Sequence, residues 1–187
     1  MSGQGADDGE ASGRGASRPS RRERPPAPAY QRALGLLVRR EHSAGELKRK
    51  LRGKGVEADE LDAALDTLQR QGFQDDRRYA EALVRSRALA GQGPVRIRAE
   101  LRMNGLSAAD VDAAFEAAEA DGLDWTEVAA RVAARFLPAL RASGRGPEAI
   151  KQRHKAVSFL LRRGFSQDQA RQALSLRHDE TSGDDDV

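Results

Sequence analysis

Apolar residues recur in one short pattern that occurs three times along the chain. Each copy has two apolar residues four positions apart, a glycine followed directly by an apolar residue, and two more apolar residues four positions apart. The copies are Leu47, Leu51, Gly55, Val56, Leu61 and Leu65; Ile97, Leu101, Gly105, Leu106, Val111 and Phe115; and Ala156, Leu160, Gly164, Phe165, Ala170 and Leu174. Residues four apart share one helix face, and glycine adopts without strain the left-handed conformation that often ends a helix. Each copy therefore predicts a helix, a tight turn and a second helix, with positive φ expected at Gly55 and Gly105.

A further amphipathic segment precedes each copy of the pattern. The first is expected to begin near Tyr30, the second at Asp75 and Asp76, which suit a helix N-terminus, and the third at Asp124. The side chains expected to face inward are Ala33, Leu34, Leu37 and Val38 in the first segment, Tyr79, Leu83 and Val84 in the second, and Trp125, Val128, Val132 and Phe136 in the third. Together with its preceding segment, each copy predicts a unit of three helices.

The period of the pattern predicts the fold class. A single pair of short helices is too small to bury a core alone, and units repeated along a chain share a core with their neighbours. We therefore predict an all-α fold, a tandem array of three three-helix repeats that is elongated and curved. The expected repeats are residues 30–72, 73–122 and 123–176. The residues predicted to cap helices are Ser43 with Glu46, Ser107 with Asp110, and Ser166 with Gln169.

Two segments outside the repeats lack the apolar residues that a core needs. Residues 1–29 are rich in Gly, Ser, Ala, Pro and Arg, and residues 177–187 are acidic. Segments of such composition cannot bury enough surface to offset their chain entropy, so we expect two disordered tails. The first is interpreted as a solubilising tail, with a weak basic arm for nucleic acid as the alternative.

The composition argues against most catalytic and metal sites. The chain has no cysteine, which excludes disulfides and thiolate zinc sites. Its histidines, His42, His154 and His178, are scattered without the spacing of a metal site or a catalytic triad. The Gly91–Pro94 loop lacks the lysine and the preceding strand of a phosphate-binding loop. We expect no enzyme activity, no metal and no cofactor. The absence of an apolar run of about 18 residues and of a signal peptide predicts a cytoplasmic protein without a membrane segment, and we expect a monomer.

Charge alternates between successive helices of the predicted repeats. The middle helix of each unit is basic, and the last helix of the first two units is acidic. Lys48 and Arg98 occupy equivalent repeat positions, as do Arg52 and Arg102, and these four residues predict a basic stripe that makes no core contact. Such a stripe suits a polyanion or an acidic protein groove, and a merely solvated face is the alternative. A repressor-type helix-turn-helix is disfavoured because its groove-reading third helix would here be acidic.

Three segments resemble the bacterial RecX regulatory proteins. Gln74–Ala80 followed by Gly91–Gly105 is similar to the central motif of that family, and Ser43–Gly55 and Lys155–Phe165 are similar to its flanking repeats. The resemblance spans about residues 30–176 and keeps the order and spacing of the family. It implies a curved array of three-helix repeats that binds the recombinase RecA. The residues of the central motif that we interpret as mainly structural are Asp76, Tyr79, Gly93, Pro94, Ile97, Leu101 and Gly105.

The function implied by this resemblance is regulation, mainly inhibition, of RecA. The chain would bind the RecA filament on single-stranded DNA and restrain ATP hydrolysis, strand exchange and co-protease activity, with weak binding of single- or double-stranded DNA. The candidates for contact with RecA or DNA are Arg39, Arg40, Lys48, Arg49, Arg52, Lys54, Arg96, Arg98, Arg102, Lys151, Arg153, Lys155, Arg162 and Arg163. The alternatives are a nucleic-acid-binding protein that coats or competes for DNA, and a helical scaffold for another protein.

Overall fold

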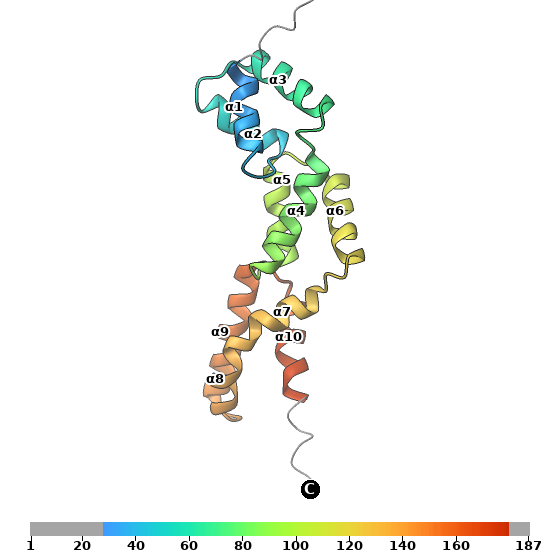
Figure 1. Cartoon of the computed structure of the whole chain (residues 1–187). Coiled ribbons are helices and arrows are strands. Elements are labelled where there is room, and N and C mark those ends of the chain that lie inside the picture. Colours follow the sequence, from blue (N-terminus) through green and yellow to red (C-terminus); the bar gives the residue numbers. More distant parts are fainter. Residues whose placement is uncertain (1–27, 180–187) are drawn as a thin grey trace, which may run out of the picture.

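The computed structural model describes residues 28–179, with side chains from Ala29 to Ser175, and every regular element in this part of the chain is a helix. The helices follow one another down an elongated molecule, with the first at one pole and the last near the other (Figure 1). They are α1 (Pro28–Leu37), α2 (Ala44–Arg52), α3 (Ala58–Arg70), α4 (Asp76–Leu89), α5 (Pro94–Met103), α6 (Ala108–Ala120), α7 (Trp125–Ala133), the 3-10 turn η1 (Ala134–Phe136), α8 (Leu137–Ala142), α9 (Pro147–Arg163) and α10 (Gln167–Asp179). The predicted all-α class is confirmed.

The same packing scheme occurs in all three units. The first and last helices of each unit pack against each other, as α1/α3, α4/α6 and α7/α10. The middle helices α2, α5 and α9 pack against the last helix of their own units. The third unit is longer because η1 and α8 stand between α7 and α9. Pro138 lies in the first turn of α8, where its missing N–H breaks no helical hydrogen bond. The predicted tandem array of three-helix repeats is therefore present.

Both ends of the helical array extend slightly beyond the expected limits. Helix α1 begins at Pro28, and its first turn is held because Ala29 is fully buried and donates its N–H to Glu60 Oε1 at 3.1 Å. Helix α10 continues to Asp179. The rest of the two predicted tails, residues 1–27 and 180–187, lies outside the described residues.

The apolar pattern read from the sequence marks the core. All fifteen apolar residues of the three copies are buried, none with more than 8% of its surface exposed. Gly55 and Gly105 have φ of 77° and 91°, which confirms the expected left-handed turns, and Gly164 has φ of 92°. The inward position predicted for Val38 is wrong: this residue is 80% exposed because α1 ends at Leu37, one residue before it.

The core is divided unequally among the units. Repeats 2 and 3 share one continuous apolar core. Repeat 1 has a separate core of its own, built around residues such as Leu47, Leu61 and Leu68. The expectation that the units share a core is therefore wrong for repeat 1. The buried side chains near its junction with repeat 2 include polar ones, which cannot extend an apolar cluster: His42, Ser43, Glu46, Gln74 and Asn104.

The three middle helices are joined end to end. Ser43 Oγ, at the start of α2, donates to the carbonyl oxygen of Asn104, at the end of α5, at 2.8 Å. At the next junction Gly93 N–H donates to the Arg163 carbonyl at 2.8 Å, and Val95 N–H to the Gly164 carbonyl at 3.0 Å. The positive end of one helix dipole therefore meets the negative end of the next. We call α2, α5 and α9 together the helix column, which runs along the long axis of the molecule (Figure 1).

Glycine is required where the ends of these helices meet. A Cβ atom on Gly45 would lie 2.3 Å from the Asn104 carbonyl oxygen, and one on Gly93 would lie 2.4 Å from the Gly164 carbonyl. Real Cβ atoms do not approach backbone atoms so closely, so a side chain at either position would push the two repeats apart. The column depends on these two contacts.

We predict that Gly45→Ala destabilises the protein by about 1–3 kcal/mol, because the added methyl group overpacks the junction. In a helix this substitution normally stabilises by roughly 0.5–1 kcal/mol. Gly35→Ala in α1 is the matched control, since a Cβ there meets nothing within 4 Å. Urea denaturation of both variants measures the two effects. A Gly45→Ala protein that gains as much stability as Gly35→Ala would show that the repeats do not touch at this glycine.

Candidate interface on the helix column

The helix column brings the basic candidate residues onto one line of helices. Helix α2 and the turn after it carry Lys48, Arg49, Arg52 and Lys54; α5 carries Arg96, Arg98 and Arg102; α9 carries Lys151, Arg153, Lys155, Arg162 and Arg163. Arg39 and Arg40 lie in the connection between α1 and α2 and are exposed. Residues as far apart in the sequence as Lys48 and Arg163 therefore belong to a single column.

Two members of the predicted basic stripe are paired within their own repeats. Lys48 Nζ lies 2.8 Å from Asp62 Oδ1 on α3, and Arg98 forms the equivalent ion pair with Asp112 on α6. The guanidinium of Arg98 also lies 4.1 Å from the centre of the buried Phe115 ring. The expectation that the stripe makes no core contact is therefore wrong for Arg98. In repeats 1 and 2 these pairs join the basic middle helix to the acidic last helix.

The other two members of the stripe remain available to a partner. Arg52 and Arg102 are exposed, and no carboxylate among the described side chains lies within ion-pair distance of either. Arg96 is likewise exposed. Arg49 is exposed but donates to Asn104 Oδ1 at 2.8 Å, so it also links repeat 1 to repeat 2. Only some of the predicted basic residues are therefore available to a partner.

A hollow of about 670 Å³ lies beside the column where repeats 1 and 2 meet. Its walls include Arg40, Arg49 and Arg96, together with the 79% exposed side chain of Met103. Arg87 also lines it and pairs with Glu100 at 2.6 Å. Arg87 was not among the sequence candidates, because it belongs to α4 and the repeated basic pattern lies on the middle helices.

Repeat 3 holds a second group of basic residues, in which the candidate Arg163 is joined by Arg131 and Arg135, two residues that the repeat pattern did not indicate. The guanidiniums of Arg135 and Arg163 lie 4.9 and 5.3 Å from the centre of the Phe159 ring. Arg163 Nη1 donates to the Ala90 carbonyl, and Arg131 Nη2 to the Ala88 carbonyl, at the end of α4. Arg131 and Arg135 stand four apart on α7 and η1, and this spacing is the signal that could have identified them.

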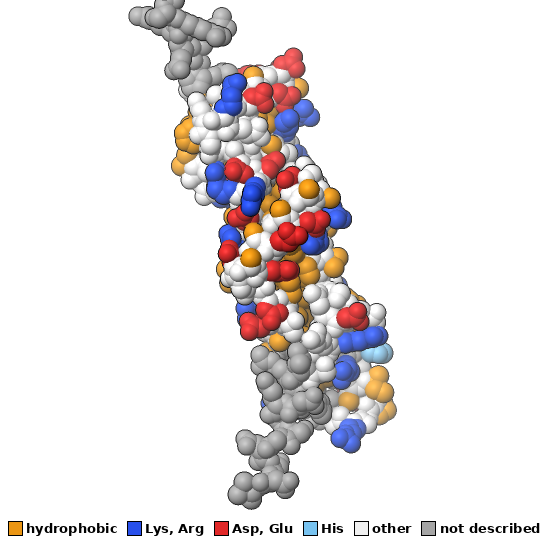
Figure 2. Space-filling model, turned by 90° about the vertical axis from the view of Figure 1, so that its right-hand side faces the viewer, with side chains coloured by type: hydrophobic (Ala, Val, Ile, Leu, Met, Phe, Trp, Pro, Cys, Tyr) orange, Lys and Arg blue, Asp and Glu red, His pale blue; other side chains and the backbone are white. Residues whose placement is uncertain are grey.

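The net charge is concentrated in repeat 3. Residues 123–175 contain ten lysines and arginines against four aspartates and glutamates, whereas the 29 acidic residues of the whole chain nearly balance its 32 basic ones. Figure 2 shows acidic and basic side chains mixed over the upper and middle parts of one face, and mainly lysines, arginines and hydrophobic side chains at its lower right end. A polyanion is therefore attracted most strongly to repeat 3.

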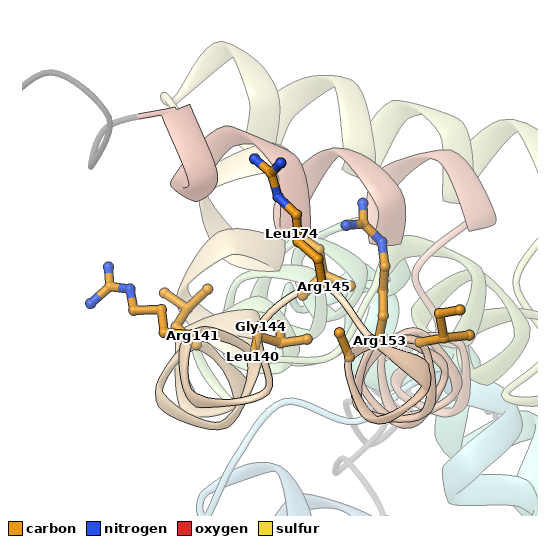
Figure 3. Close-up of a pocket in the computed structure, with 10 residues that line it drawn as sticks. Leu140, Arg141, Gly144, Arg145, Arg153 and Leu174 are labelled. Carbon is orange, nitrogen blue, oxygen red and sulfur yellow. The ribbon is translucent and has the colours of Figure 1, made fainter.

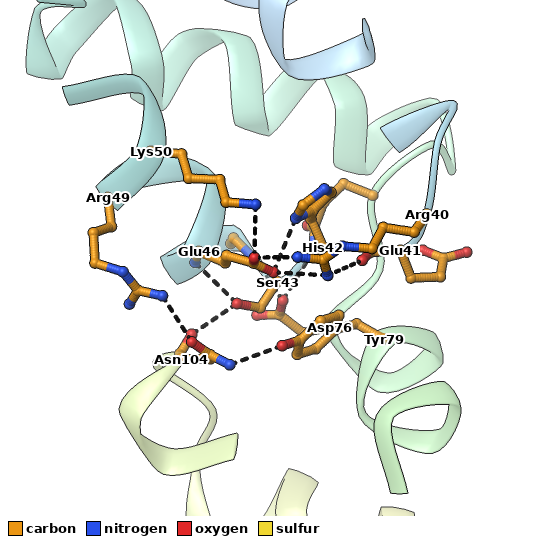
Figure 4. Close-up of polar contacts among 12 residues, drawn as sticks. Arg40, Glu41, His42, Ser43, Glu46, Arg49, Lys50, Asp76, Tyr79 and Asn104 are labelled. Atoms are coloured by element: carbon orange, nitrogen blue, oxygen red, sulfur yellow. Dashed lines mark hydrogen bonds and ion pairs between the residues drawn. The ribbon is translucent and has the colours of Figure 1, made fainter. Parts of the chain in front are cut away.

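Repeat 1 is attached to repeat 2 by a polar network, the junction cluster, formed by His42, Ser43, Glu46, Gln74, Asp76, Tyr79 and Asn104 (Figure 4). Asp76 Oδ1 accepts from the first N–H of α2, that of Ala44, at 2.8 Å. Asn104 Nδ2 donates to the buried Tyr79 hydroxyl at 2.8 Å. Asp76 thus holds the start of a helix from the neighbouring unit, whereas Tyr79 holds the Asn104 side chain within repeat 2. No local pattern predicts this network, because it joins three segments that are far apart along the chain.

Glu46 is the charged centre of the junction cluster. Its carboxylate accepts from Arg40 Nη2 at 2.5 Å and lies 2.9 Å from both Lys50 Nζ and His42 Nδ1 (Figure 4). The predicted capping box at this helix is half formed: Ser43 Oγ accepts from Glu46 N–H, while the Glu46 side chain turns to Arg40, Lys50 and His42. The capping box at Ser166 and Gln169 is complete: Gln169 Oε1 accepts from the Ser166 N–H, and Ser166 Oγ accepts from the Gln169 N–H.

This environment shifts the pKa values of both buried groups. Burial alone would raise the pKa of Glu46, but hydrogen bonds from Arg40, Lys50 and His42 outweigh it and lower the pKa to about 2. Burial lowers the pKa of His42 despite the adjacent Glu46 carboxylate. The stability that Glu46 contributes is complete above its unfolded pKa of 4.5 and is lost as the pH falls through about 2. His42 adds to the loss, because the unfolded chain takes up its proton first below pH 6.5.

No group of three or more potential metal ligands gathers anywhere in the described part of the chain. Nor is any helix among the described residues long and apolar enough to cross a membrane.

We predict that Glu46→Gln lowers the free energy of unfolding by about 1–3 kcal/mol at neutral pH, because a neutral amide then faces Arg40 and Lys50. The difference from the native protein should shrink between pH 4.5 and about 2, where native Glu46 takes up its proton. Urea denaturation at a series of pH values measures this. Glu116→Gln, at an exposed position of α6, is the control and should follow the native curve. If Glu46→Gln also follows the native curve, the ionised Glu46 does not stabilise the junction.

Three family models match consecutive parts of the chain, described as the first, second and third three-helix domains of RecX, at residues 29–76, 75–114 and 126–174. A crystal structure of regulatory protein RecX has a TM-score of 0.65 and 26% identity, and covers 79% of this chain and 72% of its own. The crystal structure of RecX from Lactobacillus salivarius has a TM-score of 0.62 at 24% identity over 79% of this chain and 93% of its own, and shares the fold.

Relatives of known family are considerably closer in sequence. The regulatory protein RecX of Xanthomonas axonopodis pv. citri (strain 306) is 50% identical over 143 residues, which are 76% of this chain and 83% of that protein. The regulatory protein RecX of Stenotrophomonas maltophilia (strain K279a) is 46% identical over 160 residues, which are 86% and 93% of the two chains. The chain therefore belongs to the RecX family, whose members are regulatory proteins and not enzymes.

Proposed function

We propose that this chain regulates RecA by binding along the RecA filament on single-stranded DNA with its helix column. Bound in this way it would restrain ATP hydrolysis, strand exchange and co-protease activity. RecX family membership supports RecA as the partner. The observation that supports the mode of binding is the end-to-end joining of α2, α5 and α9, which aligns the basic residues of all three repeats.

The dimensions of the column suit an extended partner. Its three helices contain 9, 10 and 17 residues, which at 1.5 Å per residue give a line on the order of 50 Å long. A protein filament on single-stranded DNA repeats its subunits and phosphates over such a length, so the column could contact several of them. The glycine contacts hold the helices end to end, so the column can contact several places on the filament without first being ordered, which lowers the entropic cost of binding.

Inhibition follows if the bound chain prefers one state of the filament. A ligand shifts a conformational equilibrium only by its difference in affinity for the two states. A stiff line of charge that matches one spacing of filament subunits would bind other spacings less well. The chain would then oppose the changes of filament geometry that accompany each cycle of ATP hydrolysis.

Direct binding of DNA is the second candidate function. It is favoured by repeat 3, which contains ten basic residues against four acidic ones and in which two guanidiniums lie 4.9 and 5.3 Å from the centre of the Phe159 ring. A chain acting in this way would coat DNA or compete with RecA for it.

We predict that Arg52→Glu combined with Arg102→Glu weakens inhibition of the RecA ATPase on single-stranded DNA by at least about tenfold in the concentration required. Two repulsive contacts, each worth roughly 1 kcal/mol, account for this change. Lys48 and Arg98 are left unchanged because they hold α3 and α6 through ion pairs. Exposed substitutions cost little stability, so circular dichroism should stay unaltered.

The matched control is Arg32→Glu combined with Arg70→Glu, which changes the net charge equally on exposed positions of α1 and α3, outside the column. It should inhibit RecA nearly as well as the native chain. Equal loss in both double variants would show that only net charge matters, and full inhibition by the column variant would contradict the proposed contact surface.

We predict further that salt distinguishes the two candidate functions. If the column contacts DNA phosphates, the logarithm of affinity for single-stranded DNA should fall with the logarithm of salt concentration by roughly 0.7 for each contact, and less steeply in the column variant. If it contacts RecA carboxylates, naked DNA should bind weakly to both proteins while only the native chain inhibits. Fluorescence anisotropy with a labelled oligonucleotide gives the slopes. Strong DNA binding with the same slope in both proteins would place the DNA contact outside Arg52 and Arg102.

A further inference from the structure

A hollow of about 550 Å³ lies in repeat 3 among α8, α9, the loop between them and α10 (Figure 3). Its apolar lining comes from Leu137, Leu140, Ala149, Ile150 and Leu174. Ile150 is 61% exposed, so the apolar surface is open to solvent. The hollow lies outside the threefold repeat pattern, because α8 and the following loop have no counterpart in repeats 1 and 2.

Three arginines surround this apolar surface. Arg141, Arg145 and Arg153 line the hollow and are exposed, and Arg145 and Arg153 extend in the same direction in Figure 3. None of the three has a carboxylate within ion-pair distance among the side chains that the structure describes. Like charges held around an apolar surface favour a ligand that combines several carboxylates with an apolar group.

The chain itself contains such a segment directly after the hollow. Helix α10 supplies Leu174 to the hollow and ends at Asp179. Residues 180–187 follow, and they contain four acidic residues and no basic one: Glu180, Asp184, Asp185 and Asp186. Val187 is apolar.

The distances allow this segment to reach the hollow. Asp179 lies five residues beyond Leu174, or about 7.5 Å along the helix axis. Eight residues span up to about 27 Å when extended, which is enough to reverse direction and return. Ser182 and Gly183 are residue types that favour a tight turn. A segment tethered so close has a high effective concentration at the hollow, so even weak contacts would keep it bound.

We propose that residues 180–187 bind back onto this hollow, with Asp184, Asp185 and Asp186 against Arg141, Arg145 and Arg153. The bound segment covers the apolar surface around Ile150 and neutralises part of the positive charge of repeat 3. It acts as an autoinhibitory contact, since a polyanion must displace it before reaching Arg153. This last consequence rests on the proposed binding of nucleic acid or filament, whereas the contact itself does not.

The contact can be tested without RecA or DNA, because the chain has no cysteine of its own. A protein carrying Ile150→Cys and Asp185→Cys should form an intramolecular disulfide at least about tenfold faster than one carrying Lys151→Cys and Asp185→Cys. Position 151 is one residue along the same helix but outside the lining of the hollow. Replacing the three arginines with glutamine, or adding salt to about 1 M, should remove the difference.

Three results would overturn the contact. Equal rates for the two cysteine pairs would show that the segment does not prefer the hollow. Rates unchanged by arginine replacement would show that charge does not hold it there. Disulfide-linked dimers in place of the intramolecular bond would show that a second copy, and not the chain's own segment, fills the hollow.

The autoinhibitory role has its own measurement. Ending the chain at Asp179 should tighten binding of a labelled single-stranded oligonucleotide at low salt by at least about threefold, because four negative charges are removed from the binding face. The same truncation should have no effect when Arg141, Arg145 and Arg153 are glutamine. An equal gain in both backgrounds would mean that the segment acts through net charge alone and would overturn the role of the hollow. If truncation does not tighten oligonucleotide binding although the disulfide forms as expected, the contact exists but does not inhibit binding.

Discussion

The structure depends on the meeting of helix ends at Gly45 and Gly93. At these two points the start of one middle helix lies against the last carbonyls of the next, with no room for a side chain. The hydrogen bonds there satisfy groups that helix ends otherwise leave without partners. Because the contacts involve backbone atoms, they set the distance between repeats within narrow limits. The helix column, and the line of positive charge on it, follow from this geometry.

The two junctions are similar in backbone geometry but different in chemistry. Repeats 2 and 3 share an apolar core, while repeat 1 has its own and meets repeat 2 through the ionised Glu46 and the polar side chains around it. A buried charge is stable only with its partners in place, so this junction is specific in orientation and sensitive to the loss of any one member. The attachment of repeat 1 should therefore be the one that acid weakens most, whereas repeats 2 and 3 are held together by their shared apolar core.

Much of the fold could be predicted from the sequence because it is governed by local rules. Helical spacing identified all fifteen core residues of the pattern, and the glycines that follow the first helix of each copy adopt the expected positive φ. The contacts between units could not be predicted, since they join residues such as Ser43 and Asn104 that share no periodic relation. The basic stripe was predicted only in part, because two of its four residues are in ion pairs. Lys48 pairs with Asp62 and Arg98 with Asp112, and both pairs span fourteen residues. This shared spacing could have indicated pairing within each repeat, which the alternation of charge between helices does not by itself reveal. The arginines of α8 and its loop lie outside any repeat, so the repeated pattern could not predict them.

The most direct test of the helix column as the contact surface uses single cysteines in this cysteine-free chain. Ala99 on α5 and Ser158 on α9 are exposed, and they occupy equivalent positions of the column; Ala63 on α3 and Ala109 on α6 are exposed on the acidic helices. The rate of thiol alkylation at each position is measured with and without RecA filaments on single-stranded DNA. The account predicts that filaments slow alkylation strongly at positions 99 and 158 and hardly at positions 63 and 109. Protection of the acidic helices with free reaction on the column would contradict it.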